Sequence, residues 1–217
     1  MGYNAAVAKL FADIPAFSAS VETLLTNKAD KSRLTIPMRM FKREDKLRIE
    51  TDFARIRGVG FPLESLTAMQ NIGMARVTTI VDPKDKGMLV VFPELKAYTR
   101  VALAETDLPD ADVKVTKRRG SKDTVDGQAC VRQRVTLASA NGQKVEATTW
   151  EATALNSFPI RMVFEQDDGT MEMRYTDVQL KAPAEDQFKV PSEFRSFESV
   201  TAVMQEAMAQ VRKRAGQ

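Results

Sequence analysis

Two tight-turn signals, Asn141-Gly142 and Asp168-Gly169, constrain the fold of this chain more than any other feature. Each lies between two runs in which apolar and polar residues alternate, and Asn-Gly or Asp-Gly in that setting is the strongest short-range signal for a β-hairpin. Both turns fall within the stretch from Lys114 to Pro191. This stretch therefore predicts four or five long antiparallel strands in succession, a β-meander.

The first half of the chain predicts further strands. The clearest run extends from Ser32 to Lys42 and places four apolar side chains on one face: Leu34, Ile36, Met38 and Met40. Pro37 lies within this run, and because proline cannot donate to a β-ladder it predicts an edge strand or a bulge. Other alternating segments are residues 17–26, 47–51, 76–92 and 97–103. We therefore expect nine to eleven strands in all.

Three segments space their apolar residues as a helix does: residues 3–14, 62–73 and 196–214. Helical stability in proteins comes mostly from packing an amphipathic face. For the C-terminal helix, the only large apolar surface that the sequence offers is the concave side of the predicted sheet. We therefore expect this helix to act as a lid or plug across the mouth of the sheet, through Phe197, Val200, Met204 and Met208.

These elements predict a single domain, residues 1–217, of the mainly β (α+β) class. Successive hairpins make a sheet antiparallel. A closed barrel of eight strands is already filled by its own side chains, whereas a longer curved sheet leaves room inside. We expect a single antiparallel, strongly curved sheet or incomplete β-barrel, with helices plugging its concave side.

The composition excludes several kinds of functional site. The chain has no histidine, which removes the commonest general base and metal ligand. Its one cysteine, Cys130, excludes an internal disulfide and a cysteine-based zinc site, and we interpret it as an inert thiol. Basic and acidic residues number 32 and 29 and are interspersed, so we expect no nucleic-acid partner. We expect no enzyme activity, no cofactor, no metal and no transmembrane segment.

Three short pieces of sequence, spread over residues 15–195, carry a resemblance to a known group. The first is Phe17-Ser18-Ala19 with the later hairpin strand 46–50. The second is residues 79–82, which lead to residues 92–98. The third comprises Trp150 and residues 158–161, 176–178 and 188–191. Together they resemble the LolA/LolB lipoprotein-carrier superfamily and its relatives among bacterial envelope proteins.

This resemblance implies a concave hydrophobic surface that holds acyl chains of a lipid or lipoprotein. It also implies a place in the periplasm or at the outer-membrane periphery, with contact to a membrane or to an envelope protein partner. We expect a signal peptide to be absent from the printed sequence. The carrier proper has an Arg-Pro pair on its early strands where this chain has Arg48-Ile49. The resemblance therefore favours a lipid-binding relative over lipoprotein transfer itself.

The candidate ligand-binding residues are apolar side chains of the predicted concave face, the single tryptophan and two methionines of the C-terminal helix: Leu34, Ile36, Met38, Met40, Leu47, Ile49, Met171, Met173, Trp150, Met204 and Met208. The flexible thioether of methionine suits a surface that adapts to varied ligands, but it also fills ordinary cores. The alternative is therefore a structural, assembly or sensor protein of the envelope, whose apolar face docks a protein partner without a small ligand. We interpret Lys117-Arg118-Arg119 as a solvated turn, with a phosphate or anionic-membrane site as the alternative.

Overall fold

The computed structural model describes residues 8–59, 63–85, 87–103, 113–139, 142 and 144–215. In this part of the chain a single 13-stranded sheet dominates the fold. Its strands are β1 (Ala16–Asn27), β2 (Arg33–Arg43), β3 (Lys46–Asp52), β4 (Arg57–Gly58), β5 (Arg76–Asp82), β6 (Gly87–Phe92), β7 (Ala97–Ala102), β8 (Val113–Val125), β9 (Gln128–Ser139), β10 (Lys144–Ala152), β11 (Phe158–Glu165), β12 (Gly169–Gln179) and β13 (Arg195–Phe197). The two longer helices are α2 (Leu63–Asn71) and α3 (Val200–Ala215).

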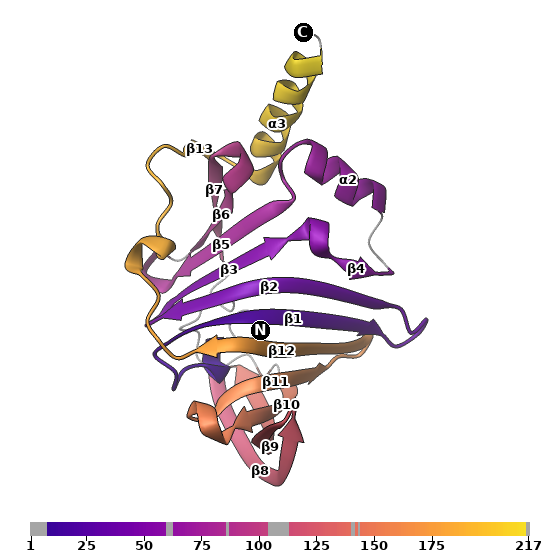
Figure 1. Cartoon of the computed structure of the whole chain (residues 1–217), viewed down its shortest axis with the longest axis vertical. Coiled ribbons are helices and arrows are strands. Elements are labelled where there is room, and N and C mark those ends of the chain that lie inside the picture. The colour runs from indigo at the N-terminus through magenta and orange to yellow at the C-terminus, as the bar shows by residue number, and fades with distance from the viewer. Residues whose placement is uncertain are drawn as a thin grey trace.

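The strand order is β13-β7-β6-β5-β3-β2-β1-β12-β11-β10-β9-β8, with β4 paired to β2 (Figure 1). Pairing is antiparallel throughout except between β13 and β7, which are parallel. The two end strands, β8 and β13, stand at opposite ends of this order, so the sheet is not closed. The predicted mainly β class and the unclosed sheet are confirmed, and the sheet is mixed rather than purely antiparallel because of β13.

Pro37 sits in an interior strand, and the prediction of an edge strand or a bulge is wrong. It pairs with Glu22 of β1 on one side. On its other side, β3 pairs with β2 only from Met38 onward, and β4 pairs only with Leu34 and Thr35. Pro37 therefore faces the gap between β3 and β4, where no ladder requires an N–H group.

The sheet curves around the main apolar core. This core includes Val81 of β5 and Met88 of β6 from one half of the sheet, and Val135 and Leu137 of β9 from the other. Strands so far apart in the sheet order reach one cluster only if the sheet bends around it. We call the face that carries this core the inner face, and the opposite one the outer face.

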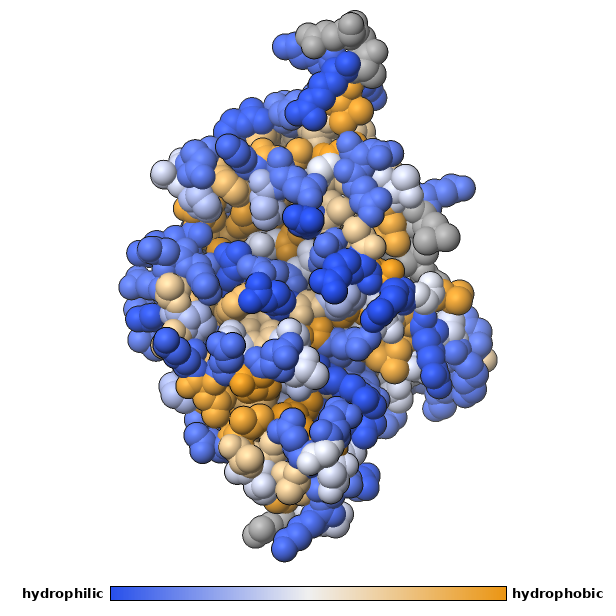
Figure 2. Space-filling model, in the orientation of Figure 1, coloured by the Kyte–Doolittle hydropathy of each residue, from blue (hydrophilic) through white to orange (hydrophobic). Residues whose placement is uncertain are grey.

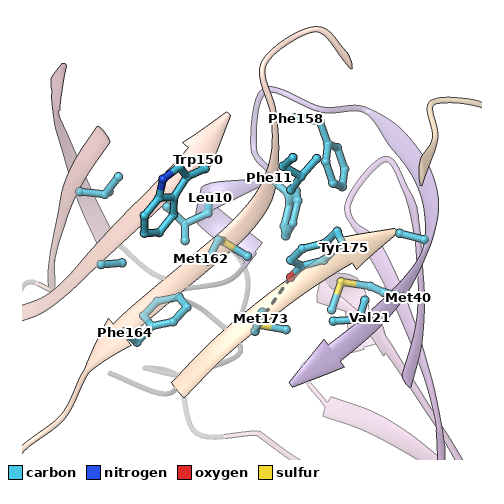
Figure 3. Close-up of a cluster of buried hydrophobic side chains, with 14 of the residues drawn as sticks. Leu10, Phe11, Val21, Met40, Trp150, Phe158, Met162, Phe164, Met173 and Tyr175 are labelled. Carbon is cyan, nitrogen blue, oxygen red and sulfur yellow. Dashed lines mark hydrogen bonds between the residues drawn. The ribbon is translucent and has the colours of Figure 1, made fainter. Parts of the chain in front are cut away.

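Aromatic side chains fill one end of the inner face (Figure 3). Phe11, from the N-terminal segment, lies with its ring centroid 4.8 Å from that of Phe17, 5.3 Å from that of Phe158 and 5.4 Å from that of Tyr175. Residues 8–10 are helical, in agreement with the predicted helix 3–14, whose first five residues lie outside the described part of the chain. The N-terminal segment thus closes this end of the curved sheet from inside.

The segment that follows β12 covers part of the outer face. Phe188 of the short helix η6 (Glu185–Phe188) packs with Phe41, Ile80 and Val91 in a second buried cluster. Phe41 and Ile80 alternate along their strands with inner-face residues, so they point outward. From η6 the chain continues to β13 and α3 (Figure 1).

The helix α3 packs at the β13–β7 edge, at the end of the molecule remote from β8 and β9 (Figure 1). Its buried residues are Val203 and Ala207, and Val203 joins a third cluster with Phe92 and Ala97. The expectation that Val200 and Met208 would be buried is wrong, since they are 40% and 38% exposed. Phe197 and Met204 are half-buried against this third cluster, so α3 covers the sheet edge.

The aromatic cluster gives a stability prediction. Replacing the fully buried Phe158 by alanine removes its contacts with Phe11, Phe17 and Tyr175 and leaves a cavity. We expect Phe158→Ala to lower the free energy of unfolding by about 3–5 kcal/mol, measured by urea denaturation. The exposed Leu180 is a control, because Leu180→Ala should change it by less than about 0.5 kcal/mol. A loss below 1 kcal/mol for Phe158→Ala would contradict the packing described.

Candidate functional site

Strand pairing places eight of the predicted ligand-binding residues on the inner face. Leu25 of β1 stands between Leu34 of β2 and Met171 of β12. Further pairs on the same face are Thr23 with Ile36 and Met173, Val21 with Met38, Met40 with Ile49, and Val81 with Leu47. Because side chains alternate between faces with a period of two, each of these sets must lie on one side of its strand. Their shared face agrees with the sequence pattern, and their role in ligand binding stays a prediction.

These eight residues divide into a filled part and an open part of the inner face. Four are buried in the core: Met40, Leu47, Met171 and Met173. Four are half-buried: Leu34, Ile36, Met38 and Ile49. Leu25 is half-buried as well, and with Leu34 it lies at the end of β1 and β2 that is remote from Phe17. We call Leu25, Leu34, Ile36, Met38 and Ile49 the aliphatic patch.

Polar groups interrupt the inner face at β8–β10. Within the described residues, the hydroxyls of Thr23 and Thr149 are buried without a hydrogen-bond partner. Near Thr149, the carboxylate of Glu151 accepts from Lys117 Nζ at 3.1 Å and from Gln133 Nε2 at 2.5 Å. Lys117 lies within strand β8, so the interpretation of its neighbourhood as a turn is wrong. The inner face is therefore apolar at its centre and charged toward one edge of the sheet.

Trp150 stands apart from the aliphatic patch. Its cross-strand partners are Arg132 and Arg161, and both guanidinium groups lie over its ring, 5.5 Å and 4.4 Å from the centroid. The indole Nε1 donates to Asp123 Oδ2 at 2.8 Å, which lowers the pKa of Asp123. In register, Trp150 belongs with these arginines, while the adjacent Thr149 pairs with Met162 of the core. Its predicted part in ligand binding has no support in this position.

The two helical methionines also lie away from the aliphatic patch. Met204 packs against the third cluster with Phe92, and Met208 is largely exposed on α3. The structure therefore does not bring Met204 and Met208 together with Met38 or Met173. The 3.6-residue periodicity located the helix but not the surface that it covers.

A groove of about 700 Å³ lies on the outer face, and sequence reasoning missed it. Its lining includes six arginines: Arg39, Arg48, Arg55, Arg57, Arg76 and Arg174. These residues come from β2, β3, η1 (Phe53–Arg55), β4, β5 and β12. Figure 2 shows hydrophilic side chains across the middle of this face. The only signal in the sequence is that Arg39, Arg48 and Arg174 take the outward positions of alternating strands.

Groups that could carry chemistry are few in the described part of the chain. Burial raises the pKa of the Cys130 thiol, which favours the unreactive protonated form. No group of three or more acidic or cysteine side chains is arranged to hold a metal ion among the residues that the structure describes. None of the described helices is long and apolar enough to cross a membrane.

A charged ladder crosses the outer face beside Trp150. Arg161 donates to Glu172 through Nε at 2.9 Å and Nη2 at 3.2 Å, and Arg174 Nε donates to the same carboxylate at 2.6 Å. Burial by itself would raise the pKa of Glu172, but the hydrogen bonds from the two arginines lower it below its usual range. The folded protein therefore favours the ionised carboxylate.

This ladder gives a pH prediction. A depressed carboxyl pKa adds stability above the unfolded-state value of about 4.3, and this contribution disappears as the pH falls through the folded value. We expect Glu172→Gln to lower the free energy of unfolding by about 1–2 kcal/mol at pH 7, and by much less at pH 3. Urea denaturation at both pH values checks this, with the exposed Glu165→Gln as control. A difference that is equally large at pH 3 would rule out the ionic origin.

Comparison with known proteins finds similarity in structure only. No family model matches the sequence, and no curated protein matches it. Among solved structures, a LolA superfamily protein from Nitrosomonas europaea has a TM-score of 0.47 at 10% identity, covering 87% of this chain and 98% of that one. The Mycobacterium tuberculosis lipoprotein LppX has a TM-score of 0.42 at 10% identity, covering 82% and 95%. LprF from Mycobacterium bovis has a TM-score of 0.37 at 13% identity, covering 89% and 100%. The LolA-like resemblance thus concerns the course of the chain.

Proposed function

We propose that the protein is a non-enzymatic binding protein of the bacterial periplasm or outer-membrane periphery, and that its inner face holds acyl chains of a lipid or lipoprotein. The observation that carries this proposal is the aliphatic patch. Its side chains come from three neighbouring strands, share one face and are only half-buried, although they adjoin a densely packed core. An apolar surface that stays partly open on a concave face is suited to an apolar ligand.

The chemistry of the patch fits a flexible hydrocarbon chain. Burial of each methylene group contributes roughly 0.8 kcal/mol, so a chain of moderate length gains affinity without any directional contact. Met38 lies within the patch, and the buried Met40, Met171 and Met173 lie beneath or beside it. Their unbranched side chains can adjust to ligands of different shape. Binding through such a surface selects for apolar character and not for one particular headgroup.

Two neighbouring leucines of β1 provide a matched test. Leu25 and Leu24 are both half-buried, but Leu25 pairs with Leu34 and Met171 on the inner face, whereas Leu24 pairs with Thr35 and Glu172 on the outer face. We expect Leu25→Asp to weaken binding of a fluorescent fatty acid by at least about tenfold, because a charge placed against an acyl chain loses its hydration. Leu24→Asp should leave the affinity unchanged. Fluorescence titration measures the affinity, and circular dichroism verifies that both variants are folded.

The same experiment separates the docking alternative from ligand binding. If the wild-type protein does not bind the fatty acid, or if folded Leu25→Asp and Leu24→Asp variants bind it equally well, the aliphatic patch is not an acyl site. The patch would then be a surface for an envelope protein partner. Met38→Asp serves as a second inner-face variant if Leu25→Asp does not fold.

A further inference from the structure

The outer-face groove has a floor of short side chains. It lies where β12, β1, β2, β3 and β5 run side by side, and its floor includes Ser20, Pro37, Thr78 and Thr176. Long side chains project from the surrounding positions, so the difference in side-chain length creates the hollow. A volume of about 700 Å³ is typical of a site for a small molecule.

The groove is lined by more cationic than anionic groups. Its six arginines face four carboxylates, those of Glu22, Glu50, Asp52 and Asp126. Glu50 is already held by Arg48, whose Nε and Nη2 donate to it at 2.9 Å and 2.7 Å. Arg39 approaches the same carboxylate only at 3.7 Å. Arg48 therefore satisfies Glu50, and the positive charge of Arg39 remains available to another anion.

Arg76 is in a similar situation on the opposite wall. Its Nε lies 3.7 Å from Asp52 and 3.5 Å from Glu94, and its side chain is 64% exposed, as is that of Arg39. Long, exposed ion pairs of this kind contribute little to stability. Arg39 and Arg76 can therefore leave their carboxylates for a ligand at small cost. Arg57, paired with Glu22 at 3.0 Å, is even more exposed.

We propose that this groove binds a phosphate group, either of a lipid headgroup or of a small soluble phosphate ester. The planar fork of arginine matches phosphate oxygens in a bidentate manner, which makes arginine the preferred residue for such groups. The mixed polar lining does not suit an acyl chain. The site is independent of the acyl-binding proposal, because Met38 and Arg39 are adjacent on β2 and point to opposite faces of the sheet.

The test uses glycerol 1-phosphate as a probe, titrated calorimetrically into the full chain at low salt. The double variant Arg39→Gln/Arg76→Gln removes the two weakly paired arginines. The control Arg118→Gln/Arg134→Gln removes two exposed arginines of β8 and β9, which do not line the groove, and it changes the net charge equally. We expect saturable binding that the groove variant weakens at least about tenfold and the control leaves within about twofold. Glu22→Gln, which frees Arg57, should tighten binding.

Vesicles distinguish the two sources of phosphate. Flotation with phosphatidylglycerol vesicles, but not with phosphatidylcholine vesicles, that is lost in the groove variant and kept in the control assigns the site to an anionic lipid headgroup. Binding of glycerol 1-phosphate without vesicle binding assigns it to a soluble ester. The proposal is overturned if neither probe binds saturably, or if the groove and control variants lose binding equally. Leu25→Asp should retain phosphate binding, so that failure of either proposed site is seen separately.

Discussion

The pairing of β1 with β12 holds the two halves of this protein together. Strands β2–β7 follow β1 on one side and β8–β11 precede β12 on the other, so each half consists of local hairpins and only this ladder joins them. Its register ends at Asn27 and Gly169. A Cβ atom at Gly169 would lie 2.0 Å from the carbonyl oxygen of Thr26, so the residue that begins β12 after the Asp-Gly turn also permits the close approach of β1.

One continuous sheet gives the protein two surfaces of different chemistry. Along β1 and β2, each inner-face residue of the aliphatic patch is followed or preceded by an outer-face residue, such as Leu24 beside Leu25 or Arg39 beside Met38. The sheet separates the two surfaces, so that an apolar ligand and an anion can be bound without competing. Curvature then makes the inner face concave, while the short residues of the outer face leave the groove.

The N-terminal segment decides how much of the concave face is open. Phe11 inserts among Phe17, Phe158 and Tyr175 and fills one end, where Met40 and Met173 are also buried (Figure 3). The aliphatic patch lies toward the other end, at the tips of β1 and β2. The division explains why methionines with the same strand pattern differ in exposure. Met38 is half-buried and Met40 is buried, although both point inward.

The sequence by itself determined the hairpins and the face on which each residue lies, because tight turns and side-chain alternation are local properties of the chain. It could therefore place Leu34, Ile36, Met38 and Met40 on one face. Only the tertiary structure decided what covers each face. Pro37 is interior because β3 ends and β4 begins opposite it, and α3 packs at the β7 edge because the segment after β12 leads it there. The groove arginines come from strands that are distant in sequence, and no local pattern records how such strands meet.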